Sequence, residues 1–395
     1  MHLSNEDALK LINALRSGTT PHHHAEALAT GRKEEIEEFR RCLDLLDKGS
    51  GLVKIITGDF GVGKTFLVNT FKRLALDEDY VISDFQINNG FRLNKLEDLY
   101  YAIMHNLYLK DKPNMKASFD DIFDWWVKNL QNAPYAERKR FEVNTVCQEL
   151  SKYNMNYARA FLSFMRGRIQ RNQEMMNVSG AWITGERNIP FALKQKYDLI
   201  GNVDKANTLD FLKAFTKLVT LLDYKGLIVF IDEIDLVLHD RNDIRHTAYN
   251  NLKQLIDLST SGDMPNIMFV FSGTKEILED TERGILSNVP LSQRLNLSIE
   301  SNALEKSLNK PMASRQSVIS LNPLDAESLM AMTHKIVRLY GQNTKLPLTV
   351  DPHLLFSDVM KEMNPKTMVT RHYVTKLIEH LDLLPIPKHE DRAAF

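Results

Sequence analysis

The sequence predicts an α/β protein in which a parallel sheet of five strands lies between two layers of helices. Five short apolar runs, rich in β-branched residues and bounded by turn or capping residues, have the composition of buried strands. Helical stretches separate these runs, which indicates parallel pairing through right-handed crossovers. A glycine-rich segment also joins the first run to an apolar helix. The expected strands are residues 53–57, 81–87, 227–231, 267–271 and 318–321.

Two helices are expected before the first strand. Residues 6–16 carry apolar side chains at helical spacing, and the turn-forming residues 17–21 end that pattern. Residues 32–46 repeat apolar positions near a period of 3.6, and the glycines at 49 and 51 close the segment. The second helix is therefore amphipathic and leads into the first strand.

The chain is expected to divide into three parts. Residues 1–30 form an N-terminal helix and loop, and residues 31–322 form the α/β domain. The gap between the second and third strands is too long for a simple crossover and is rich in helix formers, so residues from about 94 to 224 are expected to be a helical insertion. Apolar spacing becomes helical again after Pro323, and residues 323–395 are expected to form a small all-α lid.

Composition limits the classes of function. The 395 residues include 43% hydrophobic residues, enough for one large or two ordinary domains. With 50 basic and 51 acidic residues, any nucleic-acid contact must be local. Cys42 and Cys147 match neither a disulfide framework nor a CxxC metal site. Because we find neither a signal-like apolar region nor a run of eighteen apolar residues, we expect a cytoplasmic protein with no membrane partner.

The strongest motif is GDFGVGKT at residues 58–65, a complete GxxxxGK[ST] pattern between a strand and a helix. Its glycines let backbone N–H groups surround phosphates, and the helix N-terminus adds a favourable dipole. Lys64 is expected to bridge the terminal phosphates and Thr65 to bind Mg²⁺. The segment predicts ATP and Mg²⁺ as cofactors. The expected nucleotide contacts are Gly58, Asp59, Phe60, Gly61, Val62, Gly63, Lys64, Thr65 and Phe66.

Two carboxylates end the apolar strand 227–231. Asp232 is expected to hold the Mg²⁺ shell, and Glu233 can orient and deprotonate the attacking water. The second acid favours hydrolysis over binding alone. The alternative is that Glu233 caps the next helix together with Asp235.

Small hydroxyl residues follow the fourth strand. Either Ser272 or Thr274 could contact the γ-phosphate or the attacking water, and we favour Thr274. The alternative is that both hydroxyls cap the helix that starts at Lys275.

Three cationic residues are candidates for stabilising transition-state charge. Arg294 lies between the fourth and fifth strands, where it could reach the nucleotide of a neighbouring subunit, although surface arginines are common. Lys366 and Arg371 lie near the start of the last long helix and could reach the phosphates. The sequence does not choose between these two.

The insertion contains a locally basic stretch with interspersed aromatic residues. Such a stretch could bind a phosphate backbone. The alternative is an amphipathic helix with solvated arginines and aromatic core positions. The basic residues are Arg138, Lys139, Arg140, Arg159, Arg166, Arg168 and Arg171.

The order of these elements resembles the AAA+ superfamily, and within it the branch of origin-recognition and helicase-loader ATPases. The segment Gly31-Arg32-Lys33-Glu34-Glu35-Ile36 is similar to the GRxxEi segment that leads into the P-loop there and lies beside the adenine. The resemblance therefore implies that Arg32 contacts the nucleotide. It also implies the strand order 5-1-4-3-2 and a preference for ATP.

Three further segments resemble the ATP-binding proteins of bacteriophage-exclusion (BREX) defence systems, of the BrxD type. The resemblance covers about residues 18–384. It implies an ATPase that is linked to DNA and to a large helicase-like partner from the same defence locus. One departure is Asn364-Pro365-Lys366, where the family tends to have Thr-Pro-Arg; lysine keeps the charge but loses the fork geometry. The segments are Gly18-Thr19-Thr20-Pro21, Trp182-Ile183-Thr184-Gly185-Glu186 and Tyr224-Lys225-Gly226-Leu227.

Together these features predict a Mg²⁺-dependent ATPase of anti-phage defence. We expect it to form a homo-oligomer, to complete its sites with Arg294 in trans, and to couple hydrolysis to DNA binding and remodelling or to helicase recruitment. The alternative is a nucleotide-gated scaffold that recruits a partner protein with little hydrolysis. The pair Asp232 and Glu233 favours the first function.

Overall fold

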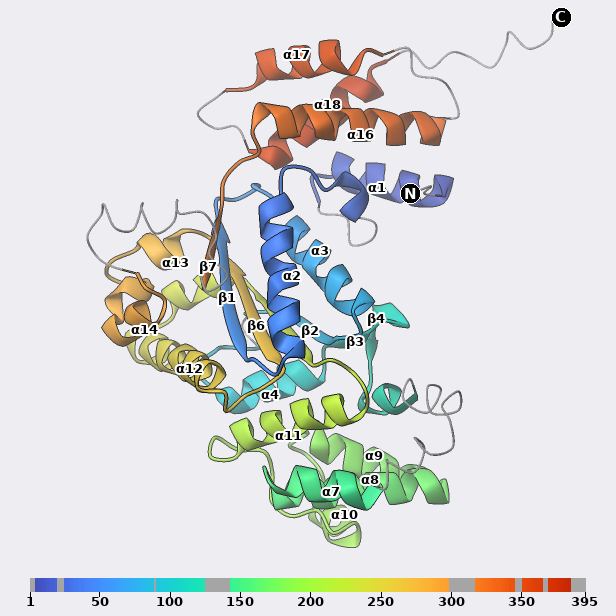
Figure 1. The fold of residues 1–395 in the computed structure, drawn as a ribbon, viewed down its shortest axis with the longest axis vertical. Helices are drawn as coiled ribbons and strands as arrows, with labels where there is room; N and C mark the ends of the chain where they lie inside the picture. Colours follow the sequence, from blue (N-terminus) through green and yellow to red (C-terminus); the bar gives the residue numbers. More distant parts are fainter. Residues whose placement is uncertain are drawn as a thin grey trace, which may run out of the picture. The chain divides into compact units, whose positions relative to one another are not determined.

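The computed structural model describes residues 4–19, 25–88, 90–124, 143–297, 317–344, 350–364 and 369–384 (Figure 1). The chain separates into two compact units, each built from segments that are distant in sequence. Unit 1 contains Met1–Glu37, Thr57–Phe71 and Ser320–Phe395, and unit 2 contains Glu38–Ile56 and Lys72–Ile319.

Unit 2 is built on a seven-stranded sheet with the order β4-β3-β2-β5-β6-β1-β7. β2 pairs in parallel with β5, and β5 pairs in parallel with β6, with Val81, Leu227 and Ile267 in register. Five of the strands lie where the sequence predicts them: β1 (Leu52–Gly58), β2 (Val81–Gln86), β5 (Leu227–Asp232), β6 (Ile267–Gly273) and β7 (Val318–Leu321).

The sheet differs from the predicted one beyond β2. There β3 (Leu107–Leu109) pairs antiparallel with β2, and β4 (Lys112–Ala117) pairs antiparallel with β3. The five predicted strands follow one another as β7-β1-β6-β5-β2, which is the order 5-1-4-3-2 among themselves. The prediction of a sheet with only five parallel strands is wrong, because two antiparallel strands extend the sheet beyond β2. β3 is short and β4 reads KPNMKA, so neither shows the apolar alternation that identifies a strand in a sequence.

The strands alternate their side chains between two covered faces. Phe230 of β5 packs near Phe39 of α2 (Lys33–Asp47), with ring centroids 6.5 Å apart. The neighbouring Val229 and Ile231 join a large core with the insertion and α12 (Asn242–Ser261). Burial on both faces explains why β5 and β6 are almost wholly apolar. The remaining elements after β5 are η2 (Ile234–His239), α13 (Glu276–Glu279), η3 (Ile285–Ser287) and α14 (Val289–Arg294).

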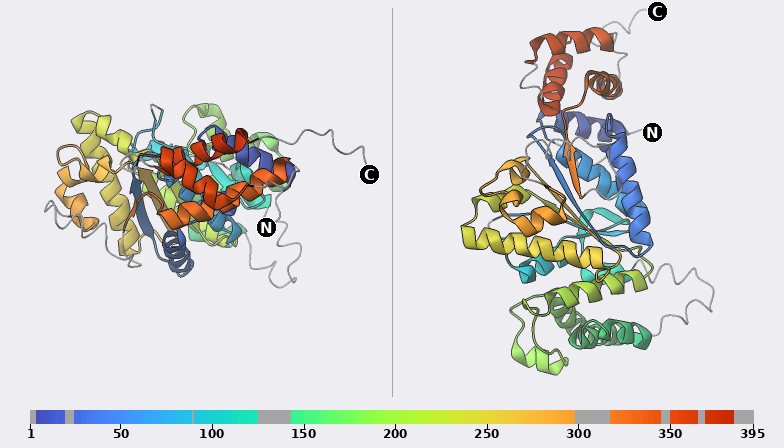
Figure 2. Two further views of the ribbon diagram at one scale, coloured as in Figure 1. Left: turned by 90° about the horizontal axis from the view of Figure 1, so that it is seen from above. Right: turned by 60° about the vertical axis from the view of Figure 1, so that its left-hand side comes forward.

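The predicted insertion is mainly helical (Figure 2). Its buried side chains belong to the same core as those of the sheet. Trp182 is 2% exposed, its indole N–H donates to the carbonyl oxygen of Gly201 at 2.9 Å, and its ring lies 5.3 Å from that of Phe211. Trp125 and Trp126 lie outside the described residues. The helices are α4 (Leu96–Met104), α7 (Val143–Ser151), α8 (Met155–Gln170), α9 (Gln173–Ile183), α10 (Phe191–Lys196) and α11 (Thr208–Leu221).

Unit 1 has a second core, formed by helices from both ends of the chain. Arg16 donates from Nε and a terminal nitrogen to Asp382, each at 2.8 Å, and the Tyr340 hydroxyl donates to the same carboxylate. The N-terminal helix is thereby attached to the C-terminal ones. The elements are α1 (Asn5–Arg16), η1 (Ala25–Leu28), α3 (Lys64–Asp77, which continues into unit 2), α16 (Ala326–Thr344), α17 (Pro352–Glu362) and α18 (Thr370–Asp382).

The predicted boundaries at residues 30/31 and 322/323 stay a prediction. Among the described helices, none is both long and apolar enough to cross a lipid bilayer.

Replacing Trp182 by alanine should lower the free energy of unfolding by about 3–5 kcal/mol, because a large buried ring is lost and a cavity remains. Urea unfolding followed by circular dichroism measures the change. The control is Phe191→Ala, since Phe191 is 79% exposed in the same insertion. An equal loss in both variants would contradict a core that the insertion shares with the sheet.

Candidate functional site

The glycine-rich loop of unit 1 requires its glycines. Gly61 has φ of 80° and Gly63 has φ of 102°, conformations that other residues rarely adopt. A Cβ atom at Gly58 would lie 2.8 Å from Cγ2 of Val62 and 2.9 Å from the carbonyl oxygen of Leu321. The loop leads directly into α3, whose first-turn N–H groups and positive dipole end suit an anion.

Lys64 lies over the loop. Its Nζ donates to the carbonyl oxygens of Gly58 at 2.8 Å and Asp59 at 3.0 Å, and it is 5.5 Å from the ring centroid of Phe60. Thr65 is exposed in the first turn of α3, and Phe66 packs against the core of unit 1. The loop thus places a cation and a hydroxyl together, which is the chemistry that phosphate and Mg²⁺ require.

Arg32 supports this loop from a buried position. Its guanidinium donates to the carbonyl oxygens of Val62 at 2.9 Å and Asn322 at 2.7 Å, and to Oε1 of Glu35 at 3.2 Å. Gly31 beside it has φ of 64°, and a Cβ atom there would lie 2.2 Å from Oγ of Ser328. Arg32 therefore positions the loop backbone, a role that the motif did not reveal. Its predicted contact with the nucleotide stays a prediction.

The start of α18 contacts the same loop. The backbone N–H of Arg371 donates to the carbonyl oxygen of Gly61 at 3.0 Å. A Cβ atom at Gly61 would lie 3.1 Å from Cγ2 of Val369 and 3.2 Å from Cβ of Arg371. Of the two lid candidates, Arg371 is thus placed beside the loop, whereas Lys366 lies outside the described residues. Their roles at the phosphates stay predictions.

Sequence analysis missed three threonine hydroxyls of unit 1, each from a residue next in sequence to one of the residues described above. Oγ1 of Thr30, Thr57 and Thr370 is buried and has no hydrogen-bond partner in the part of the chain that the structure describes. These residues directly precede Gly31, Gly58 and Arg371. Buried hydroxyls normally have a hydrogen-bond partner. Three without one in the same unit are compatible with a polar ligand that binds there. No motif includes them, because their burial depends on segments distant in sequence.

Asp232 and Glu233 lie in unit 2 at the end of β5. The Ser272 hydroxyl donates to Oδ1 of Asp232 at 2.6 Å, and the Glu233 backbone N–H donates to the same oxygen at 2.9 Å. Glu233 has φ of 61° and an exposed side chain. Partial desolvation of the carboxylate, and then the nearby Asp232 and Asp235 carboxylates, raise the pKa of Glu233. A carboxylate with a raised pKa accepts a proton more readily.

The predicted alternative for Glu233 was a helix cap. Glu233 occupies the N-cap position of η2, but its side chain makes no capping hydrogen bond. Asp235 accepts the backbone N–H of Thr274 at 2.8 Å instead. The side chain of Glu233 is therefore not committed to capping η2.

The two hydroxyl residues after β6 differ in their bonding. Ser272 is committed to Asp232, whereas Oγ1 of Thr274 is buried without a partner among the described residues. Neither Ser272 nor Thr274 caps α13, because the N-cap residue of that helix is Lys275 and the cap has no side-chain hydrogen bond. The structure thus joins Ser272 to Asp232 and the Thr274 backbone to Asp235, and it leaves the Thr274 hydroxyl uncommitted among the described residues. Its role as a sensor stays a prediction.

Arg294 ends α14 and is paired within the chain. Its Nε lies 2.9 Å from Oδ1 of Asp257, and Lys253 lies 3.4 Å from the other carboxylate oxygen. The hydrogen bond from Arg294 lowers the pKa of Asp257. The side chains of Arg294 and Asp257 are 42% and 39% exposed, and such pairs contribute only about 0–1 kcal/mol. The predicted action of Arg294 in trans stays a prediction.

The predicted basic stretch is only partly described. Arg168 binds Asp120 and Asp124, so its charge is neutralised within unit 2. Arg159 and Arg166 are exposed on α8, and Arg171 follows its last turn. Arg138, Lys139 and Arg140 lie outside the described residues.

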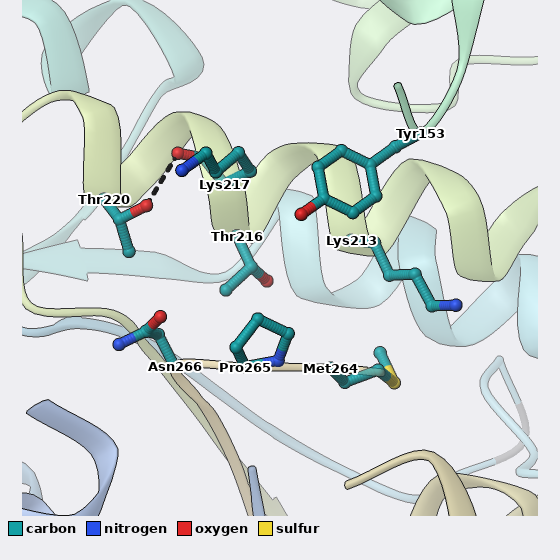
Figure 3. Close-up of a pocket in the computed structure, with 8 residues that line it drawn as sticks. All are labelled: Tyr153, Lys213, Thr216, Lys217, Thr220, Met264, Pro265 and Asn266. Carbon is teal, nitrogen blue, oxygen red and sulfur yellow. Dashed lines mark hydrogen bonds between the residues drawn. The ribbon is translucent and has the colours of Figure 1, made fainter. Parts of the chain in front are cut away.

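A cavity of about 80 Å³ lies between α11 and the segment before β6 (Figure 3). Its two lysines, Lys213 and Lys217, point away from each other on either side of the Tyr153 ring. The Thr220 hydroxyl donates to the carbonyl oxygen of Lys217. Because the charged groups diverge, this cavity does not form a site for an anion.

The expected Mg²⁺ ligands are Thr65 and Asp232. Within the described ranges, no three or more His, Cys, Asp or Glu side chains gather as a metal site. Mg²⁺ bound to a nucleotide needs only one or two protein oxygens, with phosphates and water completing the shell. Thr65 in unit 1 offers a hydroxyl and Asp232 in unit 2 a carboxylate, and each is a suitable hard ligand by itself. Their binding to one Mg²⁺ ion stays a prediction.

Comparison with known proteins identifies one family. A family model described as "BREX system ATP-binding protein BrxC/D" matches residues 3–393, nearly the whole chain. The expected resemblance to BREX ATP-binding proteins is confirmed. No curated protein matches the chain at a significant level.

Gly61→Ala should weaken ATP binding, because the added methyl group combines an unfavourable φ with contact to Val369 and Arg371. We expect a loss of about tenfold or more, equivalent to a backbone strain of about 1–2 kcal/mol. Fluorescent ATP-analogue titration measures it. Gly49→Ala is the control, because Gly49 has φ of 86° but nothing within 4 Å. Equal affinity in wild type and Gly61→Ala would show that the loop conformation is not needed.

Proposed function

The chain belongs to the BrxC/D family of BREX system ATP-binding proteins, and on that premise we propose that it is a Mg²⁺-dependent ATPase of phage defence. We further propose that hydrolysis is coupled to DNA binding and remodelling or to recruitment of a helicase-like partner. The observation that carries the proposal is the arrangement at the end of β5, where one carboxylate is fixed and the next is exposed with a raised pKa.

In this proposal the two carboxylates have different tasks. Asp232 is oriented by two donors to one oxygen, which leaves its other oxygen for the Mg²⁺ shell. Glu233 makes no capping bond, and its pKa is raised, which favours the acceptance of a proton. It would orient a water molecule and hold the proton that water loses on attack. Binding alone requires no second acid at this position.

The residues of the loop are proposed to hold ATP. Lys64 would exchange its two carbonyl partners for phosphate oxygens, and the backbone N–H groups of residues 61–65 would surround the phosphates. Thr65 would bind the Mg²⁺ ion, which neutralises phosphate charge when bound. Arg32 would keep the loop in shape through Val62 and would lie beside the base. Arg371 or Lys366 would complete the phosphate contacts.

Lys64→Ala should abolish ATP binding, whereas Glu233→Gln should bind ATP and lose turnover, because only the first variant removes a phosphate contact. We would measure ATP affinity and phosphate release with and without single- and double-stranded DNA across a salt series. DNA-stimulated turnover that disappears in Glu233→Gln supports a DNA-linked ATPase. Tight ATP binding without turnover under all conditions would favour a nucleotide-gated scaffold instead.

Arg294→Ala should lower turnover by about 10³-fold at unchanged ATP affinity if the residue stabilises the transition state in a neighbouring subunit. Mixing Arg294→Ala with Glu233→Gln provides the matched test. Mixed oligomers then contain some sites with an intact Glu233 and an intact neighbouring arginine, so activity should partly return. Wild-type turnover in Arg294→Ala would instead make the pair with Asp257 a surface ion pair only.

A further inference from the structure

Helix α8 of unit 2 has one face that is largely exposed among the described residues. It packs with α7 and α9, and residues such as Tyr157, Phe161 and Phe164 are buried. Figure 1 and Figure 2 show these helices together, below α11 in Figure 1. Other residues of α8 are exposed to solvent, and several of them recur at a regular spacing.

The exposed face follows a seven-residue repeat. Met155, Leu162 and Ile169 recur at intervals of seven, and Arg159 and Arg166 each follow one of them by four residues. At 1.5 Å per residue, the apolar positions lie roughly 10.5 Å apart along the helix, on one stripe. Met155 is 60% exposed and Ile169 is 71% exposed, both arginines are exposed, and Leu162 between them is half-buried. We call these five residues the α8 seam.

The α8 seam carries two positive charges that have no acidic partner among the described residues. Residues 143–171 contain five basic residues and one acidic residue in a chain of net charge −1. Lys152 is paired with Glu149 at 2.6 Å, and Arg168 is paired with Asp120 and Asp124. Across the described ranges, Arg159 and Arg166 take part in no hydrogen bond or ion pair. The charges that remain therefore belong mainly to the seam.

We propose that the α8 seam docks an acidic amphipathic helix of a partner protein. Apolar residues at a seven-residue repeat form the seam of a helix pair, and arginines four positions later are placed to bind acidic residues on the flank of the partner helix. Methionine and arginine are also the residue types enriched in protein interfaces. This inference specifies the partner-recruitment part of the proposed function and rests on it.

The apolar residues of the α8 seam favour a protein partner over nucleic acid. A phosphate backbone would attract Arg159 and Arg166, but it offers no apolar surface for Met155 and Ile169, which extend beyond them at both ends of the seam. A partner helix covers both kinds of residue. To reach from Met155 to Ile169 it needs at least two heptads, about 21 Å of helix.

The test uses two stapled helical peptides of about 21 residues with apolar residues at the a and d positions. One carries Glu at the e and g positions, and the other carries Lys there. Binding of the labelled peptides, and of a duplex oligonucleotide, is measured by fluorescence anisotropy. The variants are Arg159→Glu/Arg166→Glu and Ile169→Asp. Arg40→Glu/Arg241→Glu is the charge-matched control, because both arginines are exposed elsewhere in unit 2.

The wild type should bind the Glu peptide, and the Arg159→Glu/Arg166→Glu variant should lose at least about tenfold in affinity for it while gaining affinity for the Lys peptide. Ile169→Asp should weaken both, and the control should match the wild type. Circular dichroism and ATP turnover of the same samples check the fold and the proposed ATPase. No seam residue belongs to the proposed nucleotide site. A lack of ATP turnover would therefore contradict the proposed ATPase function, and the peptide binding would still test the α8 seam.

Three results would overturn the inference. The first is affinity for the Glu peptide that both seam variants retain. The second is loss of duplex binding in the variants with no binding of either peptide, which would assign the seam to nucleic acid. The third is a halved sedimentation mass in the variants, which would assign the seam to a second copy of this chain.

Discussion

The buried guanidinium of Arg32 is the interaction on which unit 1 depends. Burial of a charged group is costly unless the group is paired and hydrogen-bonded. The Arg32 guanidinium donates hydrogen bonds to Glu35, Val62 and Asn322. Those partners lie before the first strand, within the glycine loop and after the last strand. One side chain therefore links three segments that are distant in sequence, and all three belong to unit 1. The N–H of Arg371 on Gly61 adds a fourth segment.

The acidic end of β5 shows the same principle in unit 2. Parallel pairing of β5 and β6 places Ser272 beside Asp232, and the Ser272 hydroxyl fixes one carboxylate oxygen. Asp235 holds the segment after β6 through the N–H of Thr274. The left-handed backbone at Glu233 is unfavourable for a residue with a side chain, at about 1–2 kcal/mol, so its surroundings must maintain it. Strain and a raised pKa at one residue are typical of functional positions.

Sequence analysis succeeded where chemistry requires a fixed local spacing. The strand, loop and helix around residues 58–65 and the strand ending at Asp232 lie where they were predicted. It failed for β3 and β4, because short polar edge strands carry no apolar alternation. It also missed the contacts of Arg32 with Val62 and of Ser272 with Asp232, because they join residues 30 and 40 positions apart. Local patterns contain no information on such pairs.

The side chains that stabilise this fold differ from the side chains that are available to bind partners. Arg32, Ser272 and Trp182 are buried and hydrogen-bonded, so they hold the geometry of the segments around them. Glu233, Arg294 and the α8 seam are exposed, and their bonds within the chain are few or weak. Groups of the second kind can change partners at little cost, whereas changing the first kind would disturb the core. Functional change on this scaffold is therefore expected to concentrate at the exposed groups, with the buried supports unchanged.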